Sequence, residues 1–220
     1  MCNFENLLID KEKEGYLNDG QTDLKILFIL REPDAPTWDS FFMKNVVKNK
    51  GKTGGLRYYN ILKKLAQIVL NKADDDNIFQ ECAFINLYPY DGKSSAGDGF
   101  YKTLNAIKAL PNSKPENYTS TTGKDILAIA NKRIDLINNL PKGTKIITVQ
   151  DIYKALAKPD KEKYMTYKKG AISKDFFCSQ CRFNNNVIVY EFWHPSYTHI
   201  AYQPLIDITK SANHNINRTD

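Results

Sequence analysis

Residues 24–36, LKILFILREPDAP, decide the fold that we expect for this chain. The stretch begins with a short, nearly continuous apolar run, which is typical of a strand covered on both faces in a parallel sheet. The run stops at Arg31 and Glu32, and the ring of Pro33 favours an extended conformation for Glu32. Open α/β sheets bind ligands at the carboxyl ends of their strands. We therefore expect a central strand over residues 24–30 and a candidate catalytic group at Glu32.

The composition is that of one soluble globular domain. The chain has 220 residues, of which 42% are hydrophobic, and this is enough to bury a sizeable core. It has no apolar run of transmembrane length, and it begins with an acidic, polar segment rather than a targeting signal. We expect a polar lead-in over residues 1–23, a single domain over residues 24–210 and a disordered tail over residues 211–220. The expected protein is cytoplasmic and monomeric, without membrane contact.

The charge and the aromatic content together suit a nucleic-acid partner. The 31 Lys and Arg residues exceed the 25 Asp and Glu residues, which gives a net charge of +6. Many proteins of this charge bind no nucleic acid, so the charge alone decides nothing. The chain also has 13 Tyr and 11 Phe residues. Rings beside basic groups can stack on exposed bases, although most rings of a globular protein belong to its core.

The four cysteines favour reduced thiols over a metal site. Cys178 and Cys181 have a spacing that could clip a metal or form a redox pair, whereas Cys2 and Cys82 are far apart in the sequence. A tetrahedral site normally needs a second pair. We therefore expect no cofactor, with a zinc or iron–sulfur site at Cys178 and Cys181 as the minor alternative.

Strand-like and helix-like segments alternate along the rest of the chain. Further strands are expected over residues 81–90, 145–149 and 187–192, helices over residues 56–71, 101–110, 125–140, 151–157 and 198–210, and a charged loop over residues 158–169. This alternation predicts an α/β fold, a three-layer sandwich with a central, mainly parallel four-stranded sheet.

Two segments behind the first strand could serve a ligand. Trp38, Phe41 and Phe42 could sandwich a planar group or simply cap the edge of the sheet. Residues 48–55 form a basic, glycine-rich stretch whose Gly-Lys-Thr imitates the end of a phosphate-binding P-loop. That motif requires a glycine where this chain has Val46, so a nucleoside triphosphatase is excluded. The stretch is a basic loop near a polyanion or a solvated linker.

Three expected strands end in polar residues, namely Glu32, Asn86 and His194. Because the carboxyl ends of parallel strands meet at one edge of a sheet, we expect these residues to converge. A buried amide must be hydrogen-bonded, so Asn86 either ties down a neighbouring loop or binds the donor and acceptor edge of a ligand. Each residue alone has an ordinary structural explanation, and the three together favour a site.

At this point the chain resembles the uracil-DNA glycosylase superfamily. That family has a four-stranded parallel sheet, an acid or amide before proline after its first strand, an asparagine ending the second strand in some branches, and a final His-Pro-Ser motif. The matches, in the order of the family, are Glu32-Pro33, Phe84-Ile85-Asn86 and His194-Pro195-Ser196.

The resemblance implies roles for three groups at the reaction centre. Glu32 stands where the family has the carboxylate that positions water and stabilises the positive charge on the sugar. His194 stands where a histidine donates to the carbonyl oxygen of the departing base. Asn86 matches the amide that binds the pyrimidine edge. These residues would hydrolyse the N-glycosidic bond of uracil or another damaged base flipped out of single- or double-stranded DNA.

The resemblance also implies contacts around this centre. Phe42, with Trp38 and Phe41 as rivals, would stack on the flipped base. Ser196 would hold backbone phosphate, and Tyr197 lies in the loop that wedges into the duplex. Lys52 and Arg57 are further candidates for phosphate contact, independently of the resemblance.

The chain departs from the family pattern beside the acid. The family commonly has glycine and a small or amide residue where this chain has Leu30 and Arg31. Arg31, which we group with the base-binding residues, could pair with Glu32 or reach a phosphate. Asp34 stands where some members have a tyrosine that excludes thymine. The alternative function is therefore a non-catalytic nucleic-acid or nucleotide-binding module on the same fold.

Overall fold

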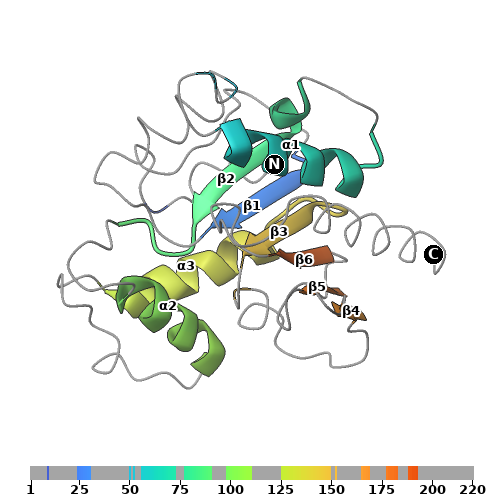
Figure 1. Cartoon of the computed structure of the whole chain (residues 1–220). Coiled ribbons are helices and arrows are strands. Elements are labelled where there is room, and N and C mark those ends of the chain that lie inside the picture. The colour runs from blue at the N-terminus through green and yellow to red at the C-terminus, as the bar shows by residue number, and fades with distance from the viewer. Residues whose placement is uncertain are drawn as a thin grey trace.

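The fold is built on a mainly parallel sheet with helices packed against it. In the computed structural model, the residues described are 9, 24–30, 50, 52, 56–72, 77–90, 98–110, 125–149, 152, 165–168, 177–182 and 188–192. The elements in chain order are β1 (Ile26–Leu30), α1 (Leu56–Val69), the 3-10 helix η3 (Ile78–Glu81), β2 (Cys82–Asn86), α2 (Asp98–Ala109), α3 (Ile126–Asn138), β3 (Lys145–Val149), β4 (Met165–Lys168), β5 (Phe177–Arg182) and β6 (Ile188–Phe192) (Figure 1).

The strand order in the sheet is β2-β1-β3-β6-β5-β4. β1 pairs in parallel with β2 and with β3, and β3 pairs in parallel with β6. The remaining pairs, β6 with β5 and β5 with β4, are antiparallel. The α/β class and the parallel sheet are thus confirmed, and β1 is an interior strand, second from one edge, rather than the centre of the sheet.

The charged stretch over residues 158–169 is not a loop throughout, because β4 occupies Met165–Lys168. The sequence also did not predict β5 (Phe177–Arg182). Together these two strands extend the expected four-stranded sheet to six strands. Both carry several polar residues, and the four-residue β4 lies at the edge of the sheet, where short strands carrying Lys are common because they discourage pairing with other chains. Such strands lack the apolar run by which the other strands were found.

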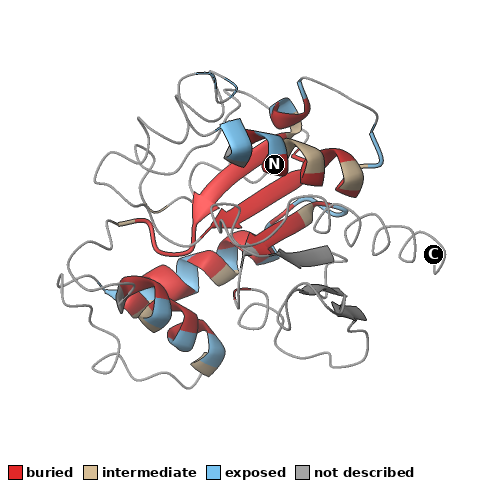
Figure 2. Cartoon of the chain, viewed as in Figure 1, coloured by how far each residue is buried: buried red, intermediate tan, exposed pale blue. Residues whose placement is uncertain are grey.

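The strands β1 and β2, at one side of the sheet, are buried on both faces. Every residue of β1 and of β2 is buried, as expected for strands between two layers of covering structure (Figure 2). On one face the rings of Phe28 and Phe84 stack with centroids 4.6 Å apart, and Phe79 meets both edge-on. Tyr59 of α1 meets Phe79 edge-on at 5.5 Å. These aromatic contacts fix α1 and η3 against that face of β1 and β2.

α1 runs back across the sheet, opposite to the strands. Its last residue, Val69, accepts a hydrogen bond from Nζ of Lys145 at 2.5 Å, and Lys145 is the first residue of β3. The carboxyl end of α1 therefore lies beside the amino ends of the strands. Its first turn, which holds Arg57, lies toward their carboxyl ends. α2 and α3 pack together and lie at the lower left in the view of Figure 1, whereas α1 lies above β1.

No helix in the described part of the chain is long and apolar enough to cross a membrane. Within the helix expected over residues 151–157, the structure describes only Ile152, which is helical and buried. The helix expected over residues 198–210, the lead-in over residues 1–23 (apart from Ile9) and the tail over residues 211–220 lie outside the described residues.

Candidate functional site

Four parallel strands end at one edge of the sheet. Leu30, the last residue of β1, is in register with Asn86, the last residue of β2. Val149, the last residue of β3, is in register with Phe192, the last residue of β6. Because all four strands point the same way, the segments that follow them leave from this common edge, which we call the carboxyl edge.

The carboxyl edge brings together the three strands that the sequence analysis singled out. Glu32 follows the end of β1 by two residues, and His194 follows the end of β6 by two residues. Both lie outside the described residues, as do Arg31, Trp38, Phe42, Ser196 and Tyr197. What the topology establishes is that the strands leading to Glu32 and His194 end at the edge where Asn86 lies.

Asn86 is a buried amide in an apolar setting. Its side chain is 1% exposed, and its strand neighbours Leu30 and Phe84 are buried as well. Neither Nδ2 nor Oδ1 has a hydrogen-bond partner among the residues that the structure describes. Leaving a buried donor or acceptor unsatisfied costs roughly 1–3 kcal/mol. A loop-bracing role for Asn86 is therefore not seen within this part of the chain, and a donor and an acceptor remain available side by side.

Arg133 is the residue at this edge that the sequence analysis missed. It lies in the middle of α3 and is 1% exposed. Its Nη2 donates to the backbone oxygen of Asn86 at 2.7 Å, and its Nε donates to that of Leu87 at 3.2 Å. A signal was present in the sequence, because Arg133 falls on the apolar stripe of the helix, four residues after Ile129 and three before Leu136.

The segment after β2 is aromatic and packs against the start of α2. Leu87, Tyr88 and Pro89 are buried, and the rings of Tyr88 and Tyr90 meet at 5.6 Å. Gly99, in the first turn of α2, lies against the ring of Tyr88 so closely that a Cβ atom at this position would overlap it. The segment that follows Asn86, residues 87–90, is therefore held in place by close packing.

The two predicted phosphate contacts that the structure describes are both exposed. Lys52 lies in a turn, and Arg57 lies in the first turn of α1, toward the carboxyl edge. Their exposure suits a polyanion near this edge, and it equally suits a solvated surface.

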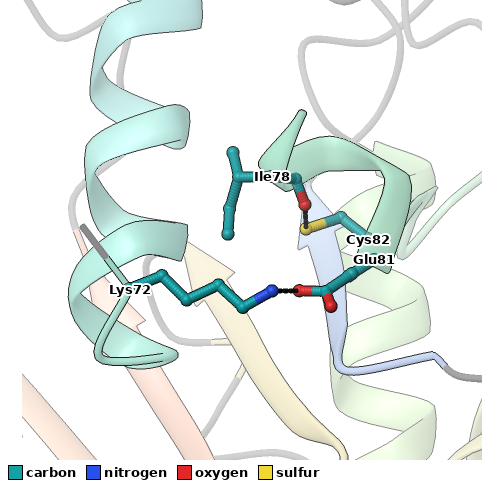
Figure 3. Close-up of polar contacts among 4 residues, drawn as sticks. All are labelled: Lys72, Ile78, Glu81 and Cys82. Atoms are coloured by element: carbon teal, nitrogen blue, oxygen red, sulfur yellow. Dashed lines mark hydrogen bonds and ion pairs between the residues drawn. The ribbon is translucent and has the colours of Figure 1, made fainter. Parts of the chain in front are cut away.

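The cysteines that the structure describes are not gathered into one site. Cys82 begins β2, at the opposite end from Asn86, and its thiol donates to the carbonyl oxygen of Ile78 at 3.4 Å (Figure 3). Burial raises the pKa of the Cys82 thiol well above its usual value; the Glu81 carboxylate adds to the rise and the Lys72 ammonium opposes it. Lys72 and Glu81 themselves form an ion pair at 2.6 Å.

Cys178 and Cys181 both lie in β5. Among the described residues, no three His, Cys, Asp or Glu side chains are grouped so that they could hold a metal ion. The minor alternative of a metal at Cys178 and Cys181 stays a prediction.

Comparison with models of known protein families finds no match to this chain, and a search of curated proteins finds none either. The function is therefore argued from the site itself.

Proposed function

We propose that this protein is a DNA glycosylase that hydrolyses the N-glycosidic bond of uracil or another damaged base flipped out of DNA. The observation that carries the proposal is the buried amide of Asn86, unpartnered among the described residues, at the edge from which the Glu32 and His194 segments leave. The proposed architecture is the three-layer sandwich of the uracil-DNA glycosylases, with β2, β1, β3 and β6 as its four-stranded parallel part.

The Asn86 amide suits a ligand that presents a donor and an acceptor next to each other. Its Oδ1 accepts and its Nδ2 donates, so one planar edge with an N–H beside a C=O would satisfy both atoms. Uracil has such an edge. Binding it would recover the roughly 1–3 kcal/mol that each unsatisfied atom costs the free protein, and a base lacking this edge would leave the cost in place.

In the proposed reaction, the segment after β1 supplies Glu32 and the segment after β6 supplies His194. As the bond from C1′ to the base nitrogen breaks, positive charge develops on the sugar, and a carboxylate at Glu32 would stabilise it and orient the attacking water. The water oxygen bonds to C1′ and gives up a proton, which the departing base anion finally takes up. The base leaves with the electron pair of the broken bond, and His194 would donate a hydrogen bond to its carbonyl oxygen.

Arg31 favours a second candidate, the non-catalytic binding module. A guanidinium beside Glu32 in the chain could pair with its carboxylate and so withdraw it from the reaction. The fold and the Asn86 contact would then serve recognition of a base or nucleotide without cleavage.

Base release separates the two candidates. Labelled single- and double-stranded oligonucleotides carrying uracil, hypoxanthine or a mismatch are incubated with wild type, Glu32→Gln, His194→Ala and Asn86→Ala. Asn139→Ala is the matched control, because Asn139 is an exposed asparagine at the end of α3. Abasic sites formed by wild type and the control, and suppressed in the other three variants, would establish the glycosylase. DNA binding without any base release would favour the binding module.

A further inference from the structure

Arg133 is the largest of the fully buried side chains in the described part of the chain. It lies on the face of α3 that also buries Ile129, Ala130, Leu136 and Ile137. Taking a guanidinium out of water costs several kcal/mol unless hydrogen bonds compensate, and apolar residues of similar volume are often at least as stabilising. The position of this side chain therefore calls for an explanation beyond packing.

Two hydrogen bonds of Arg133 converge on the place where β2 ends. Nη2 and Nε donate to two consecutive backbone oxygens, those of Asn86 and Leu87. On the other side, the backbone N–H of Leu87 donates to the carbonyl oxygen of Leu30 at 2.7 Å. The peptide unit that carries the Asn86 side chain is thus fixed by α3 and by β1 together.

We propose that Arg133 is a positioning residue, which fixes the carboxyl end of β2 and so holds the Asn86 amide in one orientation for its ligand. The inference rests on the proposed function in so far as that ligand is a base. The amide has no partner of its own among the described residues, so within this part of the chain its orientation depends on the backbone that carries it. Displacing a binding group by about 1 Å can cost on the order of 100-fold in rate.

The planar guanidinium is suited to this task, and lysine is not. Its N–H groups form a rigid fork that reaches two acceptors at once, whereas the ammonium of lysine is a point charge on a flexible stem. Arg133→Lys keeps the charge and loses the fork. It is therefore the informative variant, with Arg133→Met as a second variant that removes the charge as well. Leu136→Ala is the matched control, since Leu136 is a fully buried residue one turn further along the same helix.

The first measurement concerns the Asn86 side chain in the free protein. Its amide ¹H–¹⁵N signals are assigned by their loss in Asn86→Ala. We expect one sharp pair of signals in wild type and in Leu136→Ala, and shifted, broadened signals in Arg133→Lys and Arg133→Met. Unchanged Asn86 signals in a folded Arg133 variant would overturn the inference. This readout needs no base chemistry, so it stands or falls separately from the glycosylase proposal.

The second measurement is a double-mutant cycle on release of uracil from a single-stranded oligonucleotide. Arg133→Lys should lower kcat/KM by about 10- to 100-fold in the wild-type background. In the Asn86→Ala background the same change should cost no more than about twofold, because the residue through which Arg133 acts is gone. Equal losses in both backgrounds would mean that Arg133 only stabilises the fold. If wild type releases no base while the Asn86 signals respond as expected, the glycosylase proposal fails and the positioning role remains.

Discussion

Replacing Asn86 with leucine should make the protein more stable and abolish recognition of its ligand. Leucine has nearly the shape of asparagine and no polar atoms. The site is 1% exposed and its strand neighbours Leu30 and Phe84 are apolar, so the new side chain meets surroundings that suit it. A functional residue that costs the free protein stability is expected where binding, rather than folding, keeps the residue in place.

The size of the gain follows from the two polar atoms that have no partner among the described residues. Each unsatisfied group costs roughly 1–3 kcal/mol, and replacing such groups by apolar ones of the same shape removes that cost. The costs of two such atoms on one small side chain do not add fully. We therefore expect the free energy of unfolding of Asn86→Leu to exceed that of wild type by about 1–3 kcal/mol.

Urea denaturation, followed by circular dichroism, measures this difference, and Thr103→Val provides the matched control. Thr103 is also fully buried, but its hydroxyl donates to the carbonyl oxygen of Gly99 at 2.7 Å. The control should therefore lose about 1 kcal/mol, the net contribution of an ordinary hydrogen bond. The two polar-to-apolar substitutions are expected to change stability in opposite directions.

A loss of stability in Asn86→Leu would refute this reasoning. Removing a partnered buried amide would strand its partners and destabilise the fold by roughly 1–3 kcal/mol, as for any buried hydrogen-bonded group. That result would assign Asn86 to bracing a segment outside the described residues, which is the structural alternative that the sequence leaves open. It would also remove the observation on which the proposed function depends.

Three further predictions concern the surroundings of the site. Gly99→Ala should lower the free energy of unfolding, measured in urea, by about 1 kcal/mol or more. Overlap of the new methyl group with the buried ring of Tyr88 costs about 1–3 kcal/mol, which outweighs the gain in helix propensity of up to about 1 kcal/mol. A more stable variant would contradict this packing. Burial raises the pKa of Cys82, so the unfolded chain releases the thiol proton first as the pH rises above about 8.5, and stability should then fall by up to about 1.4 kcal/mol per pH unit. Denaturation between pH 7 and 10 should show a smaller decrease in Cys82→Ala, and equal decreases would contradict a buried thiol. If Arg57 contacts phosphate, Arg57→Ala should reduce the slope of log affinity for DNA against log salt by about one, whereas an unchanged slope would leave Arg57 as a solvated surface residue.

Much of the parallel core could be predicted from the sequence because its strands are mostly apolar. The run before Arg31 and the segment around Phe84 are buried on both faces, so their hydrophobicity alone marked them as strands. β3 was predicted with the bounds that the structure has, Lys145–Val149. β4 and β5 could not be found in this way, because their pairing with each other and with β6 comes from the sheet and not from an apolar pattern.

The sequence predicted those parts of the candidate site that lie at the ends of strands, and no others. Asn86 was singled out because it interrupts an apolar strand predicted over residues 81–90, and the structure ends β2 at Asn86 itself, before the predicted end. Arg133 escaped notice because Lys132 and Asp135 nearby make this stretch of α3 resemble a solvent-exposed face. Only the helical spacing places Arg133 on the buried stripe, and its role depends on carbonyls 46 and 47 residues away, a tertiary contact that no local pattern announces.

The hydrogen bonds of Arg133 help to decide whether the Asn86 amide braces the fold or binds a ligand. If the Asn86 side chain served to brace the fold, Arg133 could be its partner, because the buried guanidinium of Arg133 already contacts Asn86. Yet Nη2 of Arg133 donates to the backbone oxygen of Asn86, and Oδ1 has no partner within the described chain. A core arranged for stability alone would pair these two polar side chains or replace both with apolar ones. Among the described residues, the backbone oxygen of Asn86 has a donor and its side chain has no partner, which is the arrangement expected of the ligand-binding amide that we propose.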